Sequence, residues 1–367
     1  MYKIKNITLI LFMYIIILSC SQKNELDQFE KDMVNFIKDS KYTTRAFKLI
    51  DSVNLKLPAD LFLDASPIIR TWRKGFVIFN NESLNILVFN TKGQLINKFG
   101  RRGDGPGEFN KIVSGTVDKY DNVYTYDNIL KRINCFNING KLNFILNVNY
   151  FDAETRLITV DNNKNIYLHH TPSKKFNGFI SIFDSTGYKK TIVNGNEKYE
   201  SYYLRGFLEG GIVVDKNNNV YECNTYNYKI RILRSDDTKE EFGIEPSGFK
   251  ELIKANYNDP YEKIRDNFKK STIVRNLFLI YNQKLLLLEI LKFNEYDPID
   301  VDRRFIVYST NKKFLGELII SKLNNFDFSD GEYLYQLWNP PPLPFEDINK
   351  NSASIKIYKL NYSYLKN

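Results

Sequence analysis

The feature that most constrains this chain is a repeat of about fifty residues that recurs along most of its length. Phe89, Phe136 and Phe183 follow one another at intervals of 47 residues. A glycine stands four residues after each of them: Gly93, Gly140 and Gly187. Such self-similarity indicates a series of equal structural units, each of which buries its apolar face against its neighbours.

Each unit has the pattern of short strands joined by tight turns. Alternating apolar and polar residues, bounded by clusters of Asn, Asp and Gly, predict strands and hairpins. The second strands are expected to begin at Gly75, Asn122, Asn165, Asn219, Lys284 and Glu332. The third strands are expected to begin at Ile86, Arg132, Phe179, Lys229, Arg304 and Ser354. We therefore predict an all-β fold, a six-bladed β-propeller with four-stranded antiparallel blades; a seven-bladed ring and an open sheet are the alternatives.

The propeller is predicted to occupy residues 44–367 and to close by pairing the two ends of the chain. The sequence ends soon after the third strand of the sixth unit, so that unit lacks a fourth strand. Residues 47–57 (FKLIDSVNLKL) have suitable alternation, and adding them would remove an exposed sheet edge. Residues 246–270 break the strand pattern and predict a short helical insertion between blades four and five, either a lid over one face or a packing element.

The N-terminus has the features of an export signal. Lys3 and Lys5 precede an apolar run at residues 7–18, which is short for a membrane-spanning helix. The Ile-Leu-Ser-Cys that follows resembles a bacterial lipobox, which implies that residues 1–19 are a signal peptide and that Cys20 is lipidated. An ordinary signal peptide and an uncleaved anchor are the alternatives. Residues 20–43 are expected to form a tether and a short helix that hold the domain off the membrane.

The charge and composition of the chain restrict the classes of partner and cofactor that we expect it to bind. The formal charge is +9, and it falls to +7 once Lys3 and Lys5 leave with the leader. Lysine is spread along the chain rather than gathered in a basic stripe, which argues against nucleic acid as a partner. His169 and His170 are the only histidines, so a multi-histidine metal centre is impossible. We expect a monomer without a cofactor.

The clearest repeat, residues 97–142, contains FGRRGDGPGEF, TVDKYDNVYTYD and KRINCFNINGKL. This stretch resembles an NHL-type repeat, and the mature chain is similar to the lipoprotein-associated six-bladed propellers of Bacteroidetes-like bacteria. The resemblance implies an outer-membrane lipoprotein of the cell envelope, either periplasmic or surface-exposed.

Propeller topology predicts which residues share a face. Loops from the second to the third strand and crossings between blades lie on one side of the ring. We expect a binding site there, or a scaffolding surface, for a glycan, a peptide or a protein partner. The candidate residues are Arg101, Arg102, Asp104, Asp127, Arg132, His170, Asn224, Glu289 and Trp338.

An enzymatic function is the alternative. Some calcium-dependent six-bladed lactonase-like enzymes use Glu, Asn and Asp around the channel, and the same residue types recur here. They are Glu289, Asn224, Asn80 and Asp127. This alternative implies a metal-assisted hydrolase with Ca²⁺ in the axial channel. These residue types are also common in turns.

Overall fold

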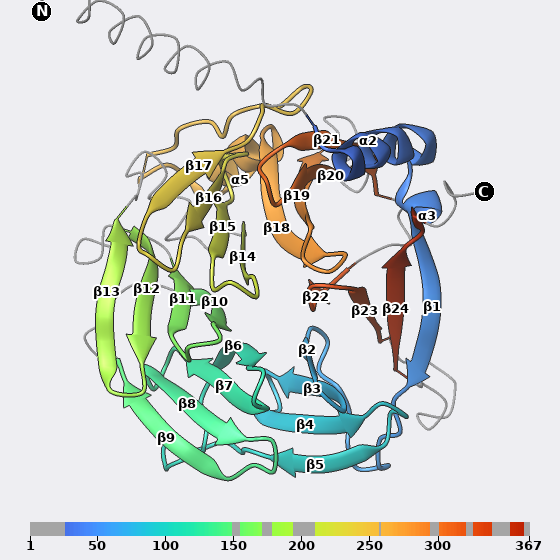
Figure 1. Cartoon of the computed structure of the whole chain (residues 1–367). Coiled ribbons are helices and arrows are strands. Elements are labelled where there is room, and N and C mark those ends of the chain that lie inside the picture. Colours follow the sequence, from blue (N-terminus) through green and yellow to red (C-terminus); the bar gives the residue numbers. More distant parts are fainter. Residues whose placement is uncertain are drawn as a thin grey trace, which may run out of the picture.

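The structure, a computed structural model, describes residues 26–148, 155–170, 178–193, 210–256, 258–293, 301–320, 326–339 and 353–362. The strands form six four-stranded antiparallel sheets around a central axis (Figure 1). The predicted six-bladed propeller is therefore confirmed. The predicted leader, Cys20 and the residues up to 25 lie outside the described residues.

Each of the first five blades is one continuous stretch of chain whose strands run in order from the axis outward (Figure 1). Blade one contains β2 (Ile68–Trp72), β3 (Gly75–Asn80), β4 (Asn85–Asn90) and β5 (Leu95–Phe99). Blade two contains β6 (Ile112–Val117), β7 (Asn122–Asp127), β8 (Arg132–Asn137) and β9 (Leu142–Asn147). Blade three contains β10 (Thr155–Val160), β11 (Ile166–His170), β12 (Gly178–Asp184) and β13 (Gly187–Val193). Blade four contains β14 (Gly210–Val214), β15 (Val220–Asn224), β16 (Ile230–Leu233) and β17 (Lys239–Phe242). Blade five contains β18 (Thr272–Ile280), β19 (Leu285–Phe293), β20 (Val301–Ser309) and β21 (Phe314–Ile319).

Blade six joins the two ends of the chain, as the sequence predicts. It contains β22 (Phe328–Ser329), β23 (Leu334–Trp338) and β24 (Ser354–Leu360), and its outermost strand is β1 (Phe47–Asn54). The register runs from Phe47 opposite Leu360 to Asn54 opposite Ser354, with an irregularity near Leu49. Backbone hydrogen bonds therefore close the ring, and β24 is not left as an open edge.

The strand order defines two faces of the ring. One face carries the turns between first and second strands and between third and fourth strands; we call it the turn face. The other carries the second-to-third loops and the crossings from one blade to the next; we call it the loop face. The predicted binding residues belong mainly to the loop face.

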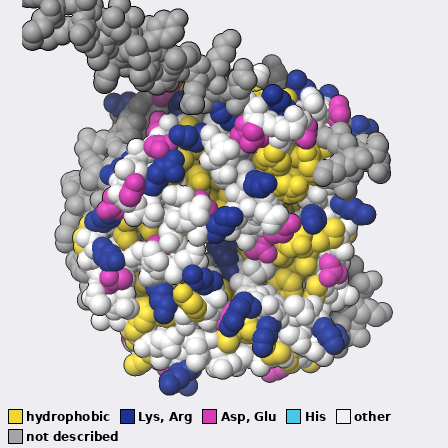
Figure 2. Space-filling view, in the orientation of Figure 1, with side chains coloured by type: hydrophobic (Ala, Val, Ile, Leu, Met, Phe, Trp, Pro, Cys, Tyr) yellow, Lys and Arg dark blue, Asp and Glu magenta, His cyan; other side chains and the backbone are white. Residues whose placement is uncertain are grey.

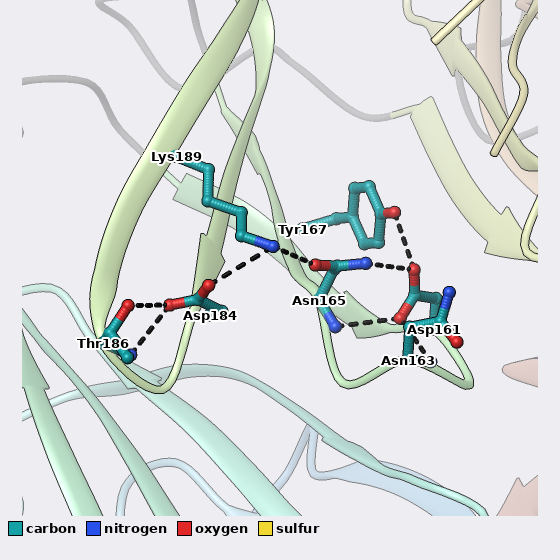
Figure 3. A network of polar contacts seen from close by, with 7 residues as sticks. All are labelled: Asp161, Asn163, Asn165, Tyr167, Asp184, Thr186 and Lys189. Carbon is teal, nitrogen blue, oxygen red and sulfur yellow. Dashed lines mark hydrogen bonds and ion pairs between the residues drawn. The ribbon is translucent and has the colours of Figure 1, made fainter. Parts of the chain in front are cut away.

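An Asp-x-x-x-Asn-x-Tyr motif shapes the first turn in three blades, at Asp118, Asp161 and Asp215. Figure 3 shows the copy in blade three. Oδ1 of Asp161 accepts the N–H groups of Asn163 and Asn165 at 2.8 Å each, while Oδ2 accepts the Asn165 amide at 2.7 Å and the Tyr167 hydroxyl at 2.9 Å. Burial and the neighbouring Asp161 charge raise the pKa of Tyr167. These aspartates are turn caps with saturated hydrogen bonds.

The core lies between adjacent blades, where apolar side chains from the middle strands interdigitate. Phe79 of blade one is fully buried and packs against the innermost strand of blade two at Gly115. A Cβ atom at Gly115 would lie 2.4 Å from the Phe79 ring, so only glycine allows this approach. Cys135 and Cys223 are buried free thiols in this inter-blade core.

The helix α2 (Gln28–Ser40) packs on the ring and does not stand apart from it (Figure 1). Asp27 caps it, because its side chain accepts the Glu30 N–H while the Glu30 side chain accepts the Asp27 N–H. Met33, Phe36 and Ile37 are buried in a cluster with blades five and six. The apolar face of this helix thus belongs to the core of the ring. The short α3 (Thr43–Ala46) leads into β1.

The insertion between blades four and five contains one helix among its described residues, α5 (Tyr261–Lys269). Ile264 of α5 is buried with Leu252 and Ala255 against blades three to five. The preceding residues are mostly irregular. The insertion thus contributes packing to the loop-face side of the ring.

Candidate functional site

A hollow of about 280 Å³ follows the ring axis. It is lined by the innermost strands of all six blades, including Arg70, Thr116, Thr159, Ile212, Asn276 and Phe328. Figure 2 shows this central hollow on the viewed face, with basic side chains in and around it. The hollow is small for a ligand site, because such pockets usually measure about 300–1,000 Å³. It suits a small ligand or the end of a larger one.

Arg70 carries an unneutralised charge into this hollow. Its Nη1 donates to the Ile69 carbonyl at 2.7 Å, and its guanidinium lies 5.7 Å from the centre of the Phe328 ring. It makes no ion pair with any described residue. Burial lowers the pKa of Arg70 to about 10, and only the Asp327 charge opposes that shift. The strand therefore presents a partly buried cation whose other N–H donors have no partner among the described residues.

Blade five adds a second charged group beside the axis. Glu289 is buried and accepts from Arg303 Nη2 at 2.6 Å and from the Asn276 amide at 3.0 Å. Arg275 Nη1 lies 3.7 Å from the same carboxylate. The register of β18 shifts between Val274 and Asn276, and Arg275 occupies this irregularity. One carboxylate thus faces two guanidinium groups.

Asp327 immediately precedes β22, at the loop-face end of the channel. Its Oδ2 accepts the Leu337 N–H at 2.6 Å. Although its side chain is accessible from the channel, the surrounding protein raises its pKa to about 6; the Leu337 hydrogen bond and the charges of Arg275 and Arg70 oppose the shift. Among the described residues, the hollow is lined by one guanidinium, Arg70, and by two carboxylates, Asp327 and Asp330; Asp330 accepts the Tyr333 N–H and the Tyr335 hydroxyl.

The structure places the predicted residues of blade two in one corner of the loop face. Asp127 is fully buried, and its carboxylate accepts the N–H groups of Asn110 and Lys111 at 2.7 and 3.0 Å and two more within its own turn. Arg132 donates to the carbonyls of Asp104, Gly105 and Glu108 at 2.6–2.9 Å. Both side chains therefore hold the Gly-Asp-Gly-Pro-Gly loop in shape.

Arg101, Arg102 and Asp104 are exposed on that loop. Arg101 Nε pairs with Glu108 at 2.8 Å, and Asp104 accepts the Asn110 amide at 2.6 Å. The loop therefore has a fixed conformation and exposes the guanidinium groups of Arg101 and Arg102.

The remaining predicted residues are dispersed. His170 is buried and hydrogen-bonds Ser181 at 2.9 Å within blade three. Asn224 is buried in blade four, and its Oδ1 has no hydrogen-bond partner among the described residues. Trp338 is exposed at the end of β23, with Lys356 Nζ 4.4 Å from its ring centre. Only Glu289 of the predicted set joins the channel cluster.

The residues expected of a calcium site make separate contacts in the structure. Asn80, Asp127, Asn224 and Glu289 belong to four different blades. Asn80 bonds the Asp64 N–H and the Phe62 carbonyl, while Asp127 and Glu289 are engaged as described above. Within the described ranges there is no group of three or more His, Cys, Asp or Glu residues that could hold a metal ion.

Arg70, Arg275 and Asp327 were missed at the sequence level. The repeat is marked by its second and third strands, while the innermost strands carry little of its signal. A charged residue inside an otherwise apolar first strand, as in Pro-Ile-Ile-Arg70-Thr-Trp, was the available clue. Such a residue in the innermost strand must face either a neighbouring blade or the axis.

A second buried ionic group joins blades three and four. Glu222 receives a two-point contact from Arg231 at 2.6 and 2.7 Å and lies 3.2 Å from His169 Nε2. Burial opposes ionisation of Glu222, but Arg231 and His169 outweigh it and lower the pKa to about 2. An outer crevice of about 220 Å³ lies beside this group, lined by Phe179 and Leu233 among others. Because Glu222 bonds Arg231 within blade four and His169 of blade three, we interpret the group as a structural link between the two blades; Nδ1 of His169 has no hydrogen-bond partner among the described residues.

Comparison with known proteins agrees with this architecture. The family described as 6-bladed beta-propeller (DUF5128) matches residues 21–296, well over half of the chain, so the protein belongs to it. A putative exported protein from Bacteroides fragilis is 14% identical, with a TM-score of 0.61 over 86% of this chain and 96% of that one. A member of the duf4221 family from Bacteroides vulgatus is 12% identical, with a TM-score of 0.59 over 86% and 99%. At these identities the likeness concerns the fold alone. A search of curated proteins finds no match, and no helix among the described residues is long and apolar enough to cross a membrane.

Proposed function

We propose that the protein is an exported, lipid-anchored propeller that binds a small carboxylate-bearing ligand in its axial channel, entering from the loop face. The observation that carries this proposal is Arg70, whose guanidinium lines the hollow and makes no ion pair with a described residue. A guanidinium fork matches a carboxylate in shape and charge. The hollow of about 280 Å³ accepts a sugar acid or the C-terminal residue of a peptide.

The fixed scaffold supports binding. Arg70 lies on an inner strand, and Glu289 and Asn276 hold Arg303 and the wall of blade five in place. A ligand carboxylate would replace the missing partner of Arg70 without a rearrangement of the ring. The loop-face residues Arg101, Arg102 and Trp338 would contact any part of the ligand that extends out of the channel.

Arg70→Gln tests the proposal, with Arg234→Gln as a matched control, because Arg234 forms a partly exposed pair with Glu240 on an outer turn. Binding of galacturonate and of the dipeptide glycylglycine would be measured by titration calorimetry. Loss of a hydrogen-bonded charge pair costs about 1.5–3 kcal/mol, so affinity for the bound probe falls roughly 10- to 100-fold in Arg70→Gln and is unchanged in the control. The two probes distinguish a sugar acid from a peptide terminus.

The free energy of unfolding of Arg70→Gln provides a second, independent test. Because Arg70 is desolvated without an ion-pair partner, removal of its charge should leave the fold as stable as before or more stable. Carboxylate binding that survives Arg70→Gln, or the absence of any binding by either probe, would refute the proposed site.

The lipid anchor is supported by the leader and by Cys20 in its Ile-Leu-Ser-Cys context. Incorporation of labelled palmitate in bacterial cells, compared between the natural chain and Cys20→Ser, tests this part separately. Loss of label with Cys20→Ser is expected. Equal labelling of both chains would show that Cys20 is not the lipidated residue.

A further inference from the structure

The turn face has a ring of lysines around its inner turns. They are Lys74, Lys119, Lys164, Lys216 and Lys284, one in each first turn of blades one to five, and all are exposed. None of the five pairs with an acidic side chain among the described residues. Figure 2, which views the ring in the orientation of Figure 1, shows basic side chains around the central hollow. We call this set the lysine collar.

The acidic residues of the same turns are directed into the protein. The carboxylates of Asp118, Asp161 and Asp215 are buried and accept backbone, amide and tyrosine hydrogen bonds, as Figure 3 shows for Asp161. Asp121 is buried and paired with Arg73. The outermost charged groups of these turns are therefore ammonium groups. Lys92 and Lys141 add exposed charge on outer turns of the same face.

An aromatic side chain stands within the collar. Tyr120 is half exposed, and the ammonium groups of Lys119 and Lys164 lie 5.0 and 5.1 Å from its ring centre. Tyrosine beside lysine is typical of surfaces that meet the headgroup region of a bilayer, because the ring is amphipathic and the ammonium group pairs with phosphate.

The N-terminal end of the described chain lies on this same face. Phe29, in the first turn of α2, stacks on Tyr281 of the β18–β19 turn with 5.7 Å between ring centres. Glu30 accepts the Ser309 hydroxyl of the β20–β21 turn at 2.6 Å. The chain from Cys20 to Leu26 is six residues long and reaches at most about 20 Å when extended. A lipid on Cys20 would therefore keep the turn face close to the membrane.

We propose that the lysine collar and Tyr120 dock on the anionic headgroups of the membrane that holds the lipid at Cys20. This inference rests on the lipid anchor of the proposed function. Charge complementarity and the short tether both select a membrane surface as the partner. In this orientation the loop face points away from the bilayer. The mouth of the channel, near Asp327, is then open to ligand.

The test uses the mature chain with Cys20→Ser, so that binding does not depend on the lipid. Sedimentation is measured with vesicles of phosphatidylethanolamine and phosphatidylglycerol and with vesicles of phosphatidylcholine alone. A triple variant replaces Lys119, Lys164 and Lys216 with glutamine. Its matched control replaces Lys111, Lys254 and Lys270, which are exposed on loop-face connections and give the same change in net charge.

A basic residue near an anionic bilayer changes affinity by about fivefold, so the collar triple should lose roughly 100-fold and the control little. Binding should require phosphatidylglycerol and weaken with salt. Equal losses in the two triples, or equal binding to phosphatidylcholine, would overturn the proposal. Palmitate labelling of the natural chain is a separate readout: labelling without collar-dependent binding would refute only the docking, and docking without labelling would refute only the anchor.

Discussion

The contacts of Asp127 indicate that this residue stabilises the fold and does not contact a ligand. Its buried carboxylate accepts four backbone N–H groups, at 2.7 Å from Asn110, 3.0 Å from Lys111, 3.0 Å from Ile129 and 2.9 Å from Leu130. The first two fix the blade crossing, and the other two fix its own turn. Asp127→Ala removes all four acceptor contacts at once.

The expected loss follows from these contacts. A hydrogen bond to a charged group contributes about 1.5–3 kcal/mol, and a donor left unpaired in a buried site costs a similar amount. Two effects make the total loss smaller than the sum of these contributions. Solvent can hydrogen-bond the N–H group of Lys111, which is exposed, and the alanine variant no longer has to bury a charged carboxylate. We therefore expect Asp127→Ala to lower the free energy of unfolding by about 2–4 kcal/mol and Asp127→Asn by about half as much.

Urea unfolding followed by far-ultraviolet circular dichroism and by tryptophan fluorescence measures this loss, provided that the two transitions coincide. Asp104→Ala is the matched control, because Asp104 is exposed on the same loop and accepts one side-chain hydrogen bond. Its loss should stay below about 1 kcal/mol. A loss of less than about 1 kcal/mol for Asp127→Ala, or equal losses for the two variants, would refute the capping role.

The remaining predictions concern three other parts of the molecule. The raised pKa of Asp327, about 6, means that its negative charge disappears as pH falls through 6, so carboxylate binding should strengthen between pH 7 and 5; titration calorimetry should show no such change in Asp327→Asn. Glu222→Ala removes the buried carboxylate that Arg231 and His169 share and should cost about 3–5 kcal/mol in urea unfolding. Because the pKa of Glu222 is lowered to about 2, its stabilisation is complete above its unfolded value near 4 and is lost as pH falls toward 2, so the natural chain should lose this advantage over Glu222→Gln in acid. A chain beginning at residue 58 lacks α2 and β1 and exposes the β24 edge, so it should be insoluble, whereas a chain beginning at residue 26 should give a folded circular dichroism spectrum.

Much of the architecture could be predicted because the propeller repeats one local pattern. The spacing of Phe89, Phe136 and Phe183 fixed the unit, and the second and third strands begin within a few residues of their expected positions. Closure by residues 47–57 followed from counting strands, since a unit with three strands leaves an edge unpaired.

The candidate site was less accessible to sequence reasoning. Turn aspartates and asparagines have the same residue types as metal or ligand sites, and only their partners distinguish the two roles. Asp127 and Arg132 prove to hold a loop, while Glu289 joins a cluster with Arg275 and Arg303. That cluster depends on a shift in strand register at Arg275, and the local sequence pattern does not predict this shift.

The sequence by itself determined the number of blades, the strand pattern and the closing strand, because these depend on periodicity and on hydrogen-bond pairing along the chain. Only the tertiary structure decided which charges meet. Arg70 and Asp327 are far apart in sequence, yet both face the axis because each adjoins the innermost strand of its blade. Whether such charges neutralise one another or remain available to a ligand depends on distances and burial across the ring, and a one-dimensional pattern contains neither.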